Sequence, residues 1–273
     1  MMQNVERTFI REILTAMLFL LPFHYLAGQP LTLLAFEYPP IYQNEENPGV
    51  ACEIALAAFK EADIEAVLSF LPVKRMIASL SAGEAHAAIG GRILFKHELT
   101  SGTVAPSNTI MHVLQTFIYD TRRFPEGLNY SSLTELSPYR IGVLNGSGIM
   151  EFLKKESALT LIPNTIHEGS ARQLYHGWID LWAIVDLTGL AYIRNLYPAE
   201  NKSFKAYSLP YEIGDITIFF SAKQDPEGIL NASFTEGFKK ILSNGTYLKI
   251  LQSYYGETSS IPEEALAPEL ILH

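Results

Sequence analysis

Two stretches of this 273-residue chain repeat one pattern 94 positions apart, and this repeat limits the possible folds more than any other feature. The first runs from Leu80 to Arg92 and the second from Leu174 to Asp186. In each, a leucine is followed by a glycine, a polar residue and an apolar run that ends on a charge. The pattern predicts a helix stopped by a glycine with positive φ, then a short buried strand. We therefore expect two similarly built halves.

The segments around the repeats alternate between strand and helix. In the first half, the apolar spacing predicts strand 31–36, helix 50–61, strand 66–70, helix 72–81 and strand 85–89. In the second half, it predicts strand 140–144, helix 149–156, strand 159–162, helix 170–175, strand 181–185 and helix 187–197. Such alternation is typical of a mainly parallel sheet with helices on both faces.

Two further segments are predicted to carry the chain between the halves. Residues 110–119 and 216–221 are β-branched and aromatic, and no flexible linker lies near them. We expect an α/β fold of two mainly parallel-sheet lobes joined by two hinge strands. The expected boundaries are lobe 1 at 29–112 and 222–257, lobe 2 at 113–221, hinge crossings near 113–119 and 213–221, and a C-terminal tail at 258–273. Two helices are expected within 226–255, and the tail is expected to be irregular.

The N-terminus is similar to an export signal. Arg7 and Arg11 precede an apolar stretch, and Leu26-Ala27-Gly28 offers a small-residue cleavage site. Residues 1–28 are therefore predicted to be a signal peptide and the protein to be periplasmic. An uncleaved anchor and an ordinary amphipathic helix are the alternatives.

Composition argues against several classes of function. The formal net charge is −9, which disfavours nucleic-acid binding because phosphates require clustered Lys and Arg. Cys52 is the only cysteine, so neither an intrachain disulfide nor a cysteine-based zinc site can form. Motifs for zinc proteases, nucleotide binding and serine hydrolases are missing from the sequence. We expect no enzyme activity, no catalytic residues, no metal and no cofactor.

The predicted strand ends carry the candidate ligand-binding residues. Ligands of open α/β sheets sit beyond the carboxyl ends of the strands, where Gly91, Arg92 and Asp186 fall. Arg92 offers a bidentate fork to a carboxylate, and Asp186 offers a partner to an ammonium. The alternatives are a solvated charge for Arg92 and a helix N-cap for Asp186. A cation and an anion facing one cleft would suit a small polar solute.

Three more residues are candidates at the same cleft. Arg75 lies at the start of a predicted helix, with a purely solubilising surface role as its alternative. Ser147 sits in a glycine-rich turn before a helix, where free backbone N–H groups favour an anion, although such turns are common. Tyr38, beside two prolines, would form an aromatic wall, and core packing is its alternative. Trp182 is expected in the core and Phe95 at the cleft rim.

The order of these motifs resembles a known family. Tyr38-Pro39-Pro40, Arg75 and Gly83 are followed by Gly142 to Ser147, by Gly177 with Asp180 and Asp186, and by the stretches 244–250 and 254–256. This order is similar to the family 3 bacterial extracellular solute-binding proteins, the polar amino-acid class that supplies ABC importers. The resemblance covers roughly residues 31–256. It implies the type II periplasmic-binding-protein fold, a monomer closing on a small polar solute, and an ABC permease as partner.

The chain also departs from the family pattern. His86 stands where the family usually has Asp, and Glu98 stands where amino-acid binders carry the carboxylate-gripping Arg. Amino-acid specificity is therefore open. One alternative is a ligand sensor acting through a separate signalling partner. Another is a dehydratase-like enzyme on the same scaffold, for which His97 or Glu98 near Arg92 would supply the acid and base.

Overall fold

The first half of the sheet is built on three parallel strands. The computed structural model describes residues 30–256 and 261–271, so the predicted signal peptide lies outside the described residues. The elements follow as β1 (Leu31–Ala35), α2 (Val50–Glu61), β2 (Ala66–Phe70), α3 (Val73–Ala82) and β3 (Ala87–Gly90). β1 pairs in parallel with both β2 and β3, giving the order β2-β1-β3. Both connections pass through a helix, as parallel neighbours require.

The second half repeats this arrangement. Its elements are β5 (Arg140–Leu144), α5 (Gly148–Leu153), β6 (Thr160–Asn164), α6 (His167–Tyr175), β7 (Leu181–Val185), α7 (Asp186–Leu196) and β8 (Phe204–Ala206). β5 pairs in parallel with β6 and β7, giving the order β6-β5-β7. Within each half, the first strand is therefore central, and β3 and β7 occupy equivalent positions. The predicted α/β class with a mainly parallel sheet is confirmed.

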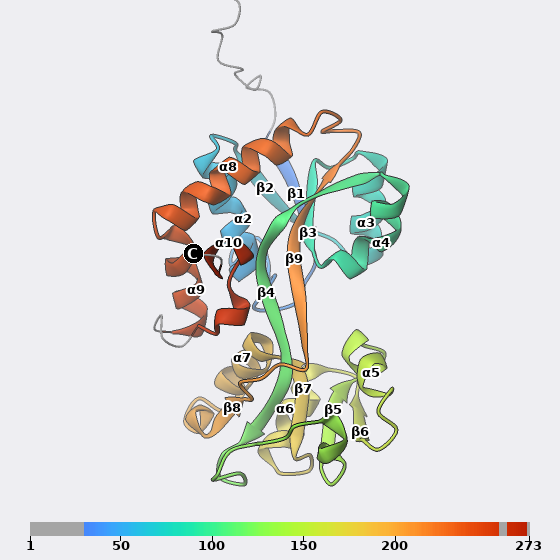
Figure 1. The fold of residues 1–273 in the computed structure, drawn as a ribbon, viewed down its shortest axis with the longest axis vertical. Coiled ribbons are helices and arrows are strands. Elements are labelled where there is room, and N and C mark those ends of the chain that lie inside the picture. The colour runs from blue at the N-terminus through green and yellow to red at the C-terminus, as the bar shows by residue number, and fades with distance from the viewer. Residues whose placement is uncertain (1–29, 257–260, 272–273) are drawn as a thin grey trace, which may run out of the picture. The chain divides into compact units, whose positions relative to one another are not determined.

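Two strands run through both halves and join them into one nine-stranded sheet (Figure 1). They are β4 (Val104–Asp120) and β9 (Glu212–Ser221), which are antiparallel to each other. β9 pairs with β3 and β4 pairs with β7. Both strands begin earlier than the sequence predicts. β4 passes through two register shifts between Pro106 and Met111, which break the alternation expected of a strand.

The parallel strands of the two halves point their carboxyl ends toward each other. β3 ends with Gly90 paired to Thr217 of β9. β7 ends with Val185 paired to Gln115 of β4, and Gln115 is also the partner of Glu212. Only the β9 residues between positions 212 and 217 separate the two ends, roughly 16 Å at the usual rise per residue. Loops that follow these strands therefore meet at the middle of β4 and β9.

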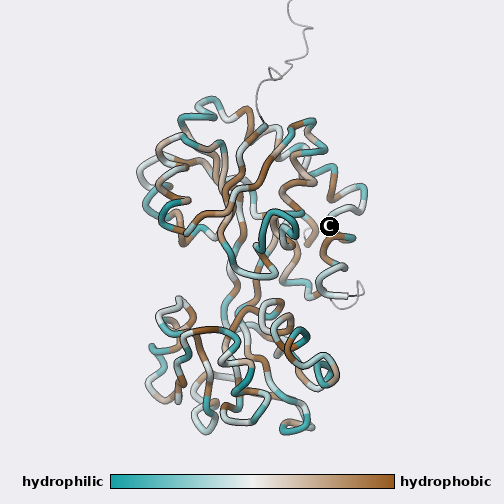
Figure 2. The backbone as a smooth tube through the Cα atoms, turned by 180° about the vertical axis from the view of Figure 1, so that it is seen from behind, coloured by the Kyte–Doolittle hydropathy of each residue, from teal (hydrophilic) through white to brown (hydrophobic). Residues whose placement is uncertain are grey.

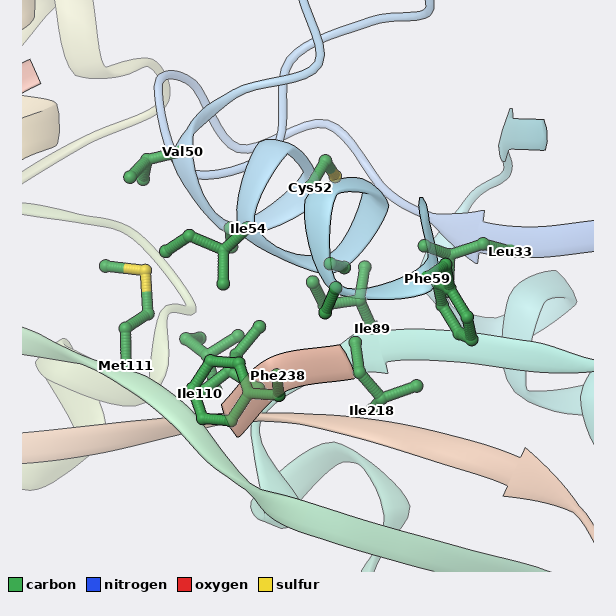
Figure 3. Close-up of a cluster of buried hydrophobic side chains, with 14 of the residues drawn as sticks. Leu33, Val50, Cys52, Ile54, Phe59, Ile89, Ile110, Met111, Ile218 and Phe238 are labelled. Atoms are coloured by element: carbon green, nitrogen blue, oxygen red, sulfur yellow. The ribbon is translucent and has the colours of Figure 1, made fainter. Parts of the chain in front are cut away.

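Helices bury one face of the first half of the sheet. α2, α8 (Ile229–Ser243) and α9 (Thr246–Tyr255) form the largest apolar cluster with the strands. In Figure 3, Ile54 and Phe59 extend from α2 toward the strands that carry Met111 and Ile218. α3 covers the opposite face through Met76 and Leu80. Figure 2 shows the hydrophobic colour concentrated along these buried strands and helix faces.

The second half has its own two apolar clusters. Phe117, Leu181 and Ala183 pack on the face covered by α5, and Trp182 and Ile184 pack on the face covered by α6 and α7. None of the helices in residues 30–256 and 261–271 combines the length and apolar character of a membrane span.

The glycines of the sequence repeat adopt the expected conformation. Gly83 follows α3 with a φ of 79°, and Gly177 follows the last turn of α6 with a φ of 70°. Each is followed by the strand next to a crossing strand, β3 in one half and β7 in the other. The helix–glycine–strand interpretation of the repeat is confirmed.

The C-terminal tail is more ordered than the sequence suggests. Its described part contains a 3-10 turn, η5 (Glu263–Ala265), and a short helix, α10 (Pro268–Ile271). The backbone N–H of Ala267 donates to the Tyr247 hydroxyl at 2.8 Å, and Asn108 of β4 donates to Glu269 at 2.8 Å. The expectation of an irregular tail was wrong, because these contacts hold the segment against α9 and β4.

Candidate functional site

Tyr38 is the candidate that bridges the two halves. It follows β1 in the tight turn of residues 38–42, where its backbone N–H donates to the Tyr42 carbonyl at 2.8 Å. Its ring contacts the ring of His167 in the second half edge-on, with centroids 5.8 Å apart. Burial raises the pKa of the Tyr38 hydroxyl well above its usual range, in surroundings that include Thr188, Tyr192 and Asp186. The structure therefore brings Tyr38 and Asp186 into one neighbourhood.

Asp186 lies at the carboxyl end of β7 and opens α7. Its side chain is buried, and Oδ2 accepts a hydrogen bond from the Tyr255 hydroxyl at 3.1 Å. Oδ1 has no hydrogen-bond partner within the described ranges. Burial raises the pKa of Asp186 to about 6, although the backbone of Leu187, the Tyr255 hydroxyl and the backbone of Leu114 oppose the shift. Asp186 is thus a buried carboxylate that forms no ion pair in residues 30–256 and 261–271.

Arg92 already has an anionic partner in the protein. It begins the 3-10 turn η1 (Arg92–Phe95) after β3, and its Nε lies 3.1 Å from Oδ2 of Asp215 on β9. Its guanidinium also donates to the Ser107 carbonyl at 3.3 Å. Gly91 is packed so closely that a Cβ atom would lie 3.1 Å from the Asp215 carbonyl oxygen. Arg92 and Asp186 do not form an ion pair with each other.

Ser147 and Arg75 differ in how they are engaged. Ser147 is the N-cap of α5, where its hydroxyl accepts from the Met150 N–H at 3.1 Å and donates to the Leu144 carbonyl at 2.7 Å. Arg75 is exposed on the first turn of α3, and its guanidinium has no partner among the residues that the structure describes. The capping contacts therefore occupy the Ser147 hydroxyl, whereas Arg75 is free.

An apolar hollow lies at the carboxyl ends of β1 and β2. Its volume is about 350 Å³, and its lining consists of Phe36, Glu37, Phe70, Leu71, Pro72 and Val73. A second hollow, of about 470 Å³, lies at the opposite end of β2. Only the first lies at the strand ends where an open α/β sheet binds its ligand. Its one charged lining residue is acidic.

An aromatic cluster, defined as Tyr38, His167, Trp182 and Tyr192, surrounds the start of α6. The His167 ring lies 6.2 Å from Trp182 and 5.7 Å from Tyr192, and these two rings lie 6.2 Å apart. Burial lowers the pKa of His167, which favours its neutral form at pH 7. Trp182 Nε1 and His167 Nδ1 are buried without a hydrogen-bond partner in the described part of the chain.

Sequence reasoning missed His167 and Tyr192. His167 comes soon after the carboxyl end of β6, so the same strand-end argument that selected Asp186 could have selected it. Trp182 is fully buried on β7, as expected of a core residue. Phe95, expected at the rim, is fully buried and stacks on Phe219 with centroids 4.1 Å apart. The rim expectation was wrong, because Phe95 fills the core under α3.

The residues considered for catalysis do not assemble with Arg92. His97 Nδ1 lies 3.5 Å from Glu98 Oε1 on α4 (Lys96–Ser101), and the His97 side chain is 87% exposed. Neither residue forms a hydrogen bond or ion pair with Arg92. In the described ranges, no three His, Cys, Asp or Glu side chains gather as a metal site would require.

Comparison with known proteins gives no match to a family model and none to a curated protein. Solved structures do match. Substrate binding domain 2 of Lactococcus lactis GlnP aligns with a TM-score of 0.62 at 16% identity, covering 84% of this chain and 96% of that one. The GluR0 ligand-binding core in complex with L-glutamate gives a TM-score of 0.65 at 9% identity, covering 84% and 100%.

A third match is the sensor domain of a signalling protein. A histidine kinase sensor domain with similarity to periplasmic binding proteins gives a TM-score of 0.60 at 13% identity, covering 88% of this chain and 99% of that one. These three matches are to two ligand-binding or substrate-binding domains and a sensor domain, and at these identities they establish the fold alone. The second substrate binding domain of a putative amino acid ABC transporter from Streptococcus pneumoniae also matches, with a TM-score of 0.64 at 19% identity, covering 83% of this chain and 99% of that one. The chain thus has the fold of the substrate-binding proteins of amino-acid ABC transporters, the type II periplasmic-binding-protein fold to which its sequence motifs point.

Proposed function

We propose that this chain is an extracytoplasmic solute-binding protein that holds a small polar solute between its two halves. One observation carries the proposal: Tyr38 of the first half contacts the second half next to Asp186, a buried carboxylate that has no cationic partner among the described residues. Burying an unpaired charge costs free energy unless a partner arrives. A bound ligand can supply that partner.

The arrangement of the strands supports the same role. The carboxyl ends of β3 and β7 face each other across a few residues of β9, so loops from both halves can contact one molecule. Contacts made to both halves favour the state in which the halves are close together. A partner protein could then bind the closed form selectively.

The other candidate residues differ in how free they are to bind a ligand. Arg75, whose guanidinium has no partner in residues 30–256 and 261–271, lies on α3, which begins beside the hollow at β1 and β2. Arg92 could bind a ligand carboxylate only by sharing or leaving Asp215, and Gly91 lets the backbone approach the site. The backbone at Gly146 and Gly148, on either side of Ser147, is exposed.

The proposal extends to location and partners. Residues 1–28 would direct export to the periplasm, where an ABC permease would receive the solute from a monomeric carrier. Support comes from the structural likeness to substrate-binding proteins of amino-acid ABC transporters and from the leader-like sequence.

A melting screen tests the function. The full-length protein would be heated with and without members of a panel of amino acids, organic acids and amines, and small-angle scattering would follow its radius of gyration. We expect at least one compound to raise the melting temperature by several degrees and to reduce the radius of gyration. Folded protein that responds to no panel member would contradict the proposal.

Sensing is the second candidate, because the histidine kinase sensor domain matches over most of both chains. A sensor would bind ligand in the same place but pass the signal to a kinase. Capture experiments with and without ligand would separate the two candidates, since a carrier binds a permease and a sensor binds a signalling protein.

A further inference from the structure

Asp186 is a buried carboxylate that no positively charged side chain neutralises within the described residues. Asp186 is 4% exposed, its Oδ1 has no hydrogen-bond partner in the described part of the chain, and its Oδ2 accepts from the neutral hydroxyl of Tyr255. The backbones of Leu187 and Leu114 also favour its charged form, but no cation in residues 30–256 and 261–271 does. The other buried acid at the ends of β7, Asp180, is paired with both Arg123 and Arg140. Among the described residues, two guanidinium groups neutralise Asp180 and none neutralises Asp186.

The surroundings of Asp186 suit a positive charge. The Tyr38 hydroxyl lies close enough to Asp186, Tyr192 and Thr188 for each to affect its pKa. Through Tyr38 and Tyr192 the site continues into the aromatic cluster. Aromatic faces attract ammonium and guanidinium groups, more strongly when water is excluded. Trp182 Nε1 and His167 Nδ1, which are buried and have no hydrogen-bond partner within the described residues, add polar groups that a ligand could satisfy.

Groups that would bind a ligand carboxylate are scarce at the same place. Arg92 is ion-paired with Asp215, and Ser147 uses its hydroxyl to cap α5. Where the sequence resemblance implies an arginine, the chain has Glu98, which faces His97. Arg75 is free but forms no ion pair with Asp186. An α-amino acid would therefore find a partner for its ammonium, whereas Arg92 and Ser147 are already engaged and could not bind its carboxylate without giving up those contacts.

We propose that the ligand is an organic cation without a carboxylate. It is an amine whose nitrogen contacts Asp186 Oδ1 and whose body packs against the aromatic cluster, of which Tyr38 is a member. This inference rests on the proposed function and specifies its substrate class. The overall charge of −9 supports it, because an acidic protein raises the local concentration of cations.

Matched pairs of ligands provide the test. Histamine and histidine, agmatine and arginine, and cadaverine and lysine each differ only by a carboxylate. Binding to the full-length protein would be measured by titration calorimetry. In the variant Trp178→Phe, Trp182 is the only tryptophan, so its fluorescence reports on the aromatic cluster directly. We expect one of the amines to bind at least tenfold more tightly than its carboxylated partner and to change the Trp182 emission.

Single substitutions test which residues contact the ligand. Asp186→Asn should weaken amine binding by about thirtyfold or more, because a charged hydrogen bond is lost while the side chain keeps its shape. Tyr38→Leu should weaken it by about tenfold and Tyr38→Phe much less. Glu168→Gln is the matched control, because this exposed carboxylate lies next to His167 and pairs with Arg172. Melting curves establish that each variant is folded.

The outcomes separate this inference from the function on which it rests. If amino acids or organic acids bind and the amines do not, the amine inference is overturned and solute binding stands. Amine binding that survives Asp186→Asn and is lost with Arg75→Gln or Arg92→Gln also overturns it. If folded protein binds none of the compounds, both proposals fail.

Discussion

Asp186→Asn is expected to stabilise the ligand-free protein at neutral pH. Burial raises the pKa of Asp186 from 3.8 to about 6, so the folded state holds its proton more tightly than the unfolded state. The stability that this group contributes is therefore complete below pH 3.8 and is lost as the pH rises through 6. At 1.36 kcal/mol per pKa unit, the ionised carboxylate costs about 3 kcal/mol at pH 7. Asn removes that charge and can still accept from Tyr255.

Thermal and urea unfolding at two pH values would measure the effect. At pH 7 the melting temperature should rise by roughly 6–12 °C, the usual response of a protein of this size to about 3 kcal/mol. At pH 4 the gain should fall below about 1 kcal/mol, because the wild-type carboxyl is then protonated in the fold. A gain that is equal at both pH values would mean that the charge is not its cause.

Asp180→Asn is the matched control at the other end of β7. Desolvation alone would raise the pKa of Asp180, but hydrogen bonds from Arg140 and Arg123 hold it below its ordinary value. This substitution should therefore destabilise the protein at pH 7, and its effect should shrink as the pH falls through the pKa of Asp180. If Asp186→Asn is also destabilising at pH 7 by more than about 1 kcal/mol, the reasoning is refuted.

Two further predictions concern the scaffold. Gly237→Ala should lower the free energy of unfolding by about 3 kcal/mol or more, because an added Cβ would overlap the Ala58 carbonyl oxygen where α8 crosses α2. The control is Gly148→Ala, whose added Cβ meets open space. In the same urea titration its free energy of unfolding should change by no more than about 0.5 kcal/mol. Tyr247→Phe should cost about 1–3 kcal/mol, because it leaves the buried Ala267 N–H without its acceptor. Faster hydrogen exchange of the tail in this variant would support the assignment, and unchanged exchange would contradict it.

The strands were predictable where hydrophobic pattern alone decides them. The buried runs of β1, β3 and β7 are short, apolar and bounded by Gly or polar residues, and all three were predicted within two residues of their bounds. The start of β9 was hidden, because Glu212, Gly214 and Asp215 look like a loop. They form a strand because β4 supplies hydrogen-bond partners, which local sequence does not reveal.

The candidate site was predictable in position more than in pairing. Strand-end reasoning selected Asp186, and the flanking prolines selected Tyr38 as an aromatic wall; the structure places these two residues near each other. The sequence did not reveal that Arg92 forms an ion pair with Asp215, which lies 123 residues away. That contact depends on the register of β9 against β3. Nor did the sequence reveal the aromatic cluster, whose members come from four different segments of the chain.

A crystal structure of the protein with its tightest-binding panel compound tests the central claim most directly. The account predicts the ligand between the two halves, with a nitrogen 2.7–3.2 Å from Asp186 Oδ1, the usual hydrogen-bond range, and with its body against Tyr38. A ligand bound elsewhere on the protein, or a complex in which Asp186 Oδ1 still lacks a partner, would contradict it.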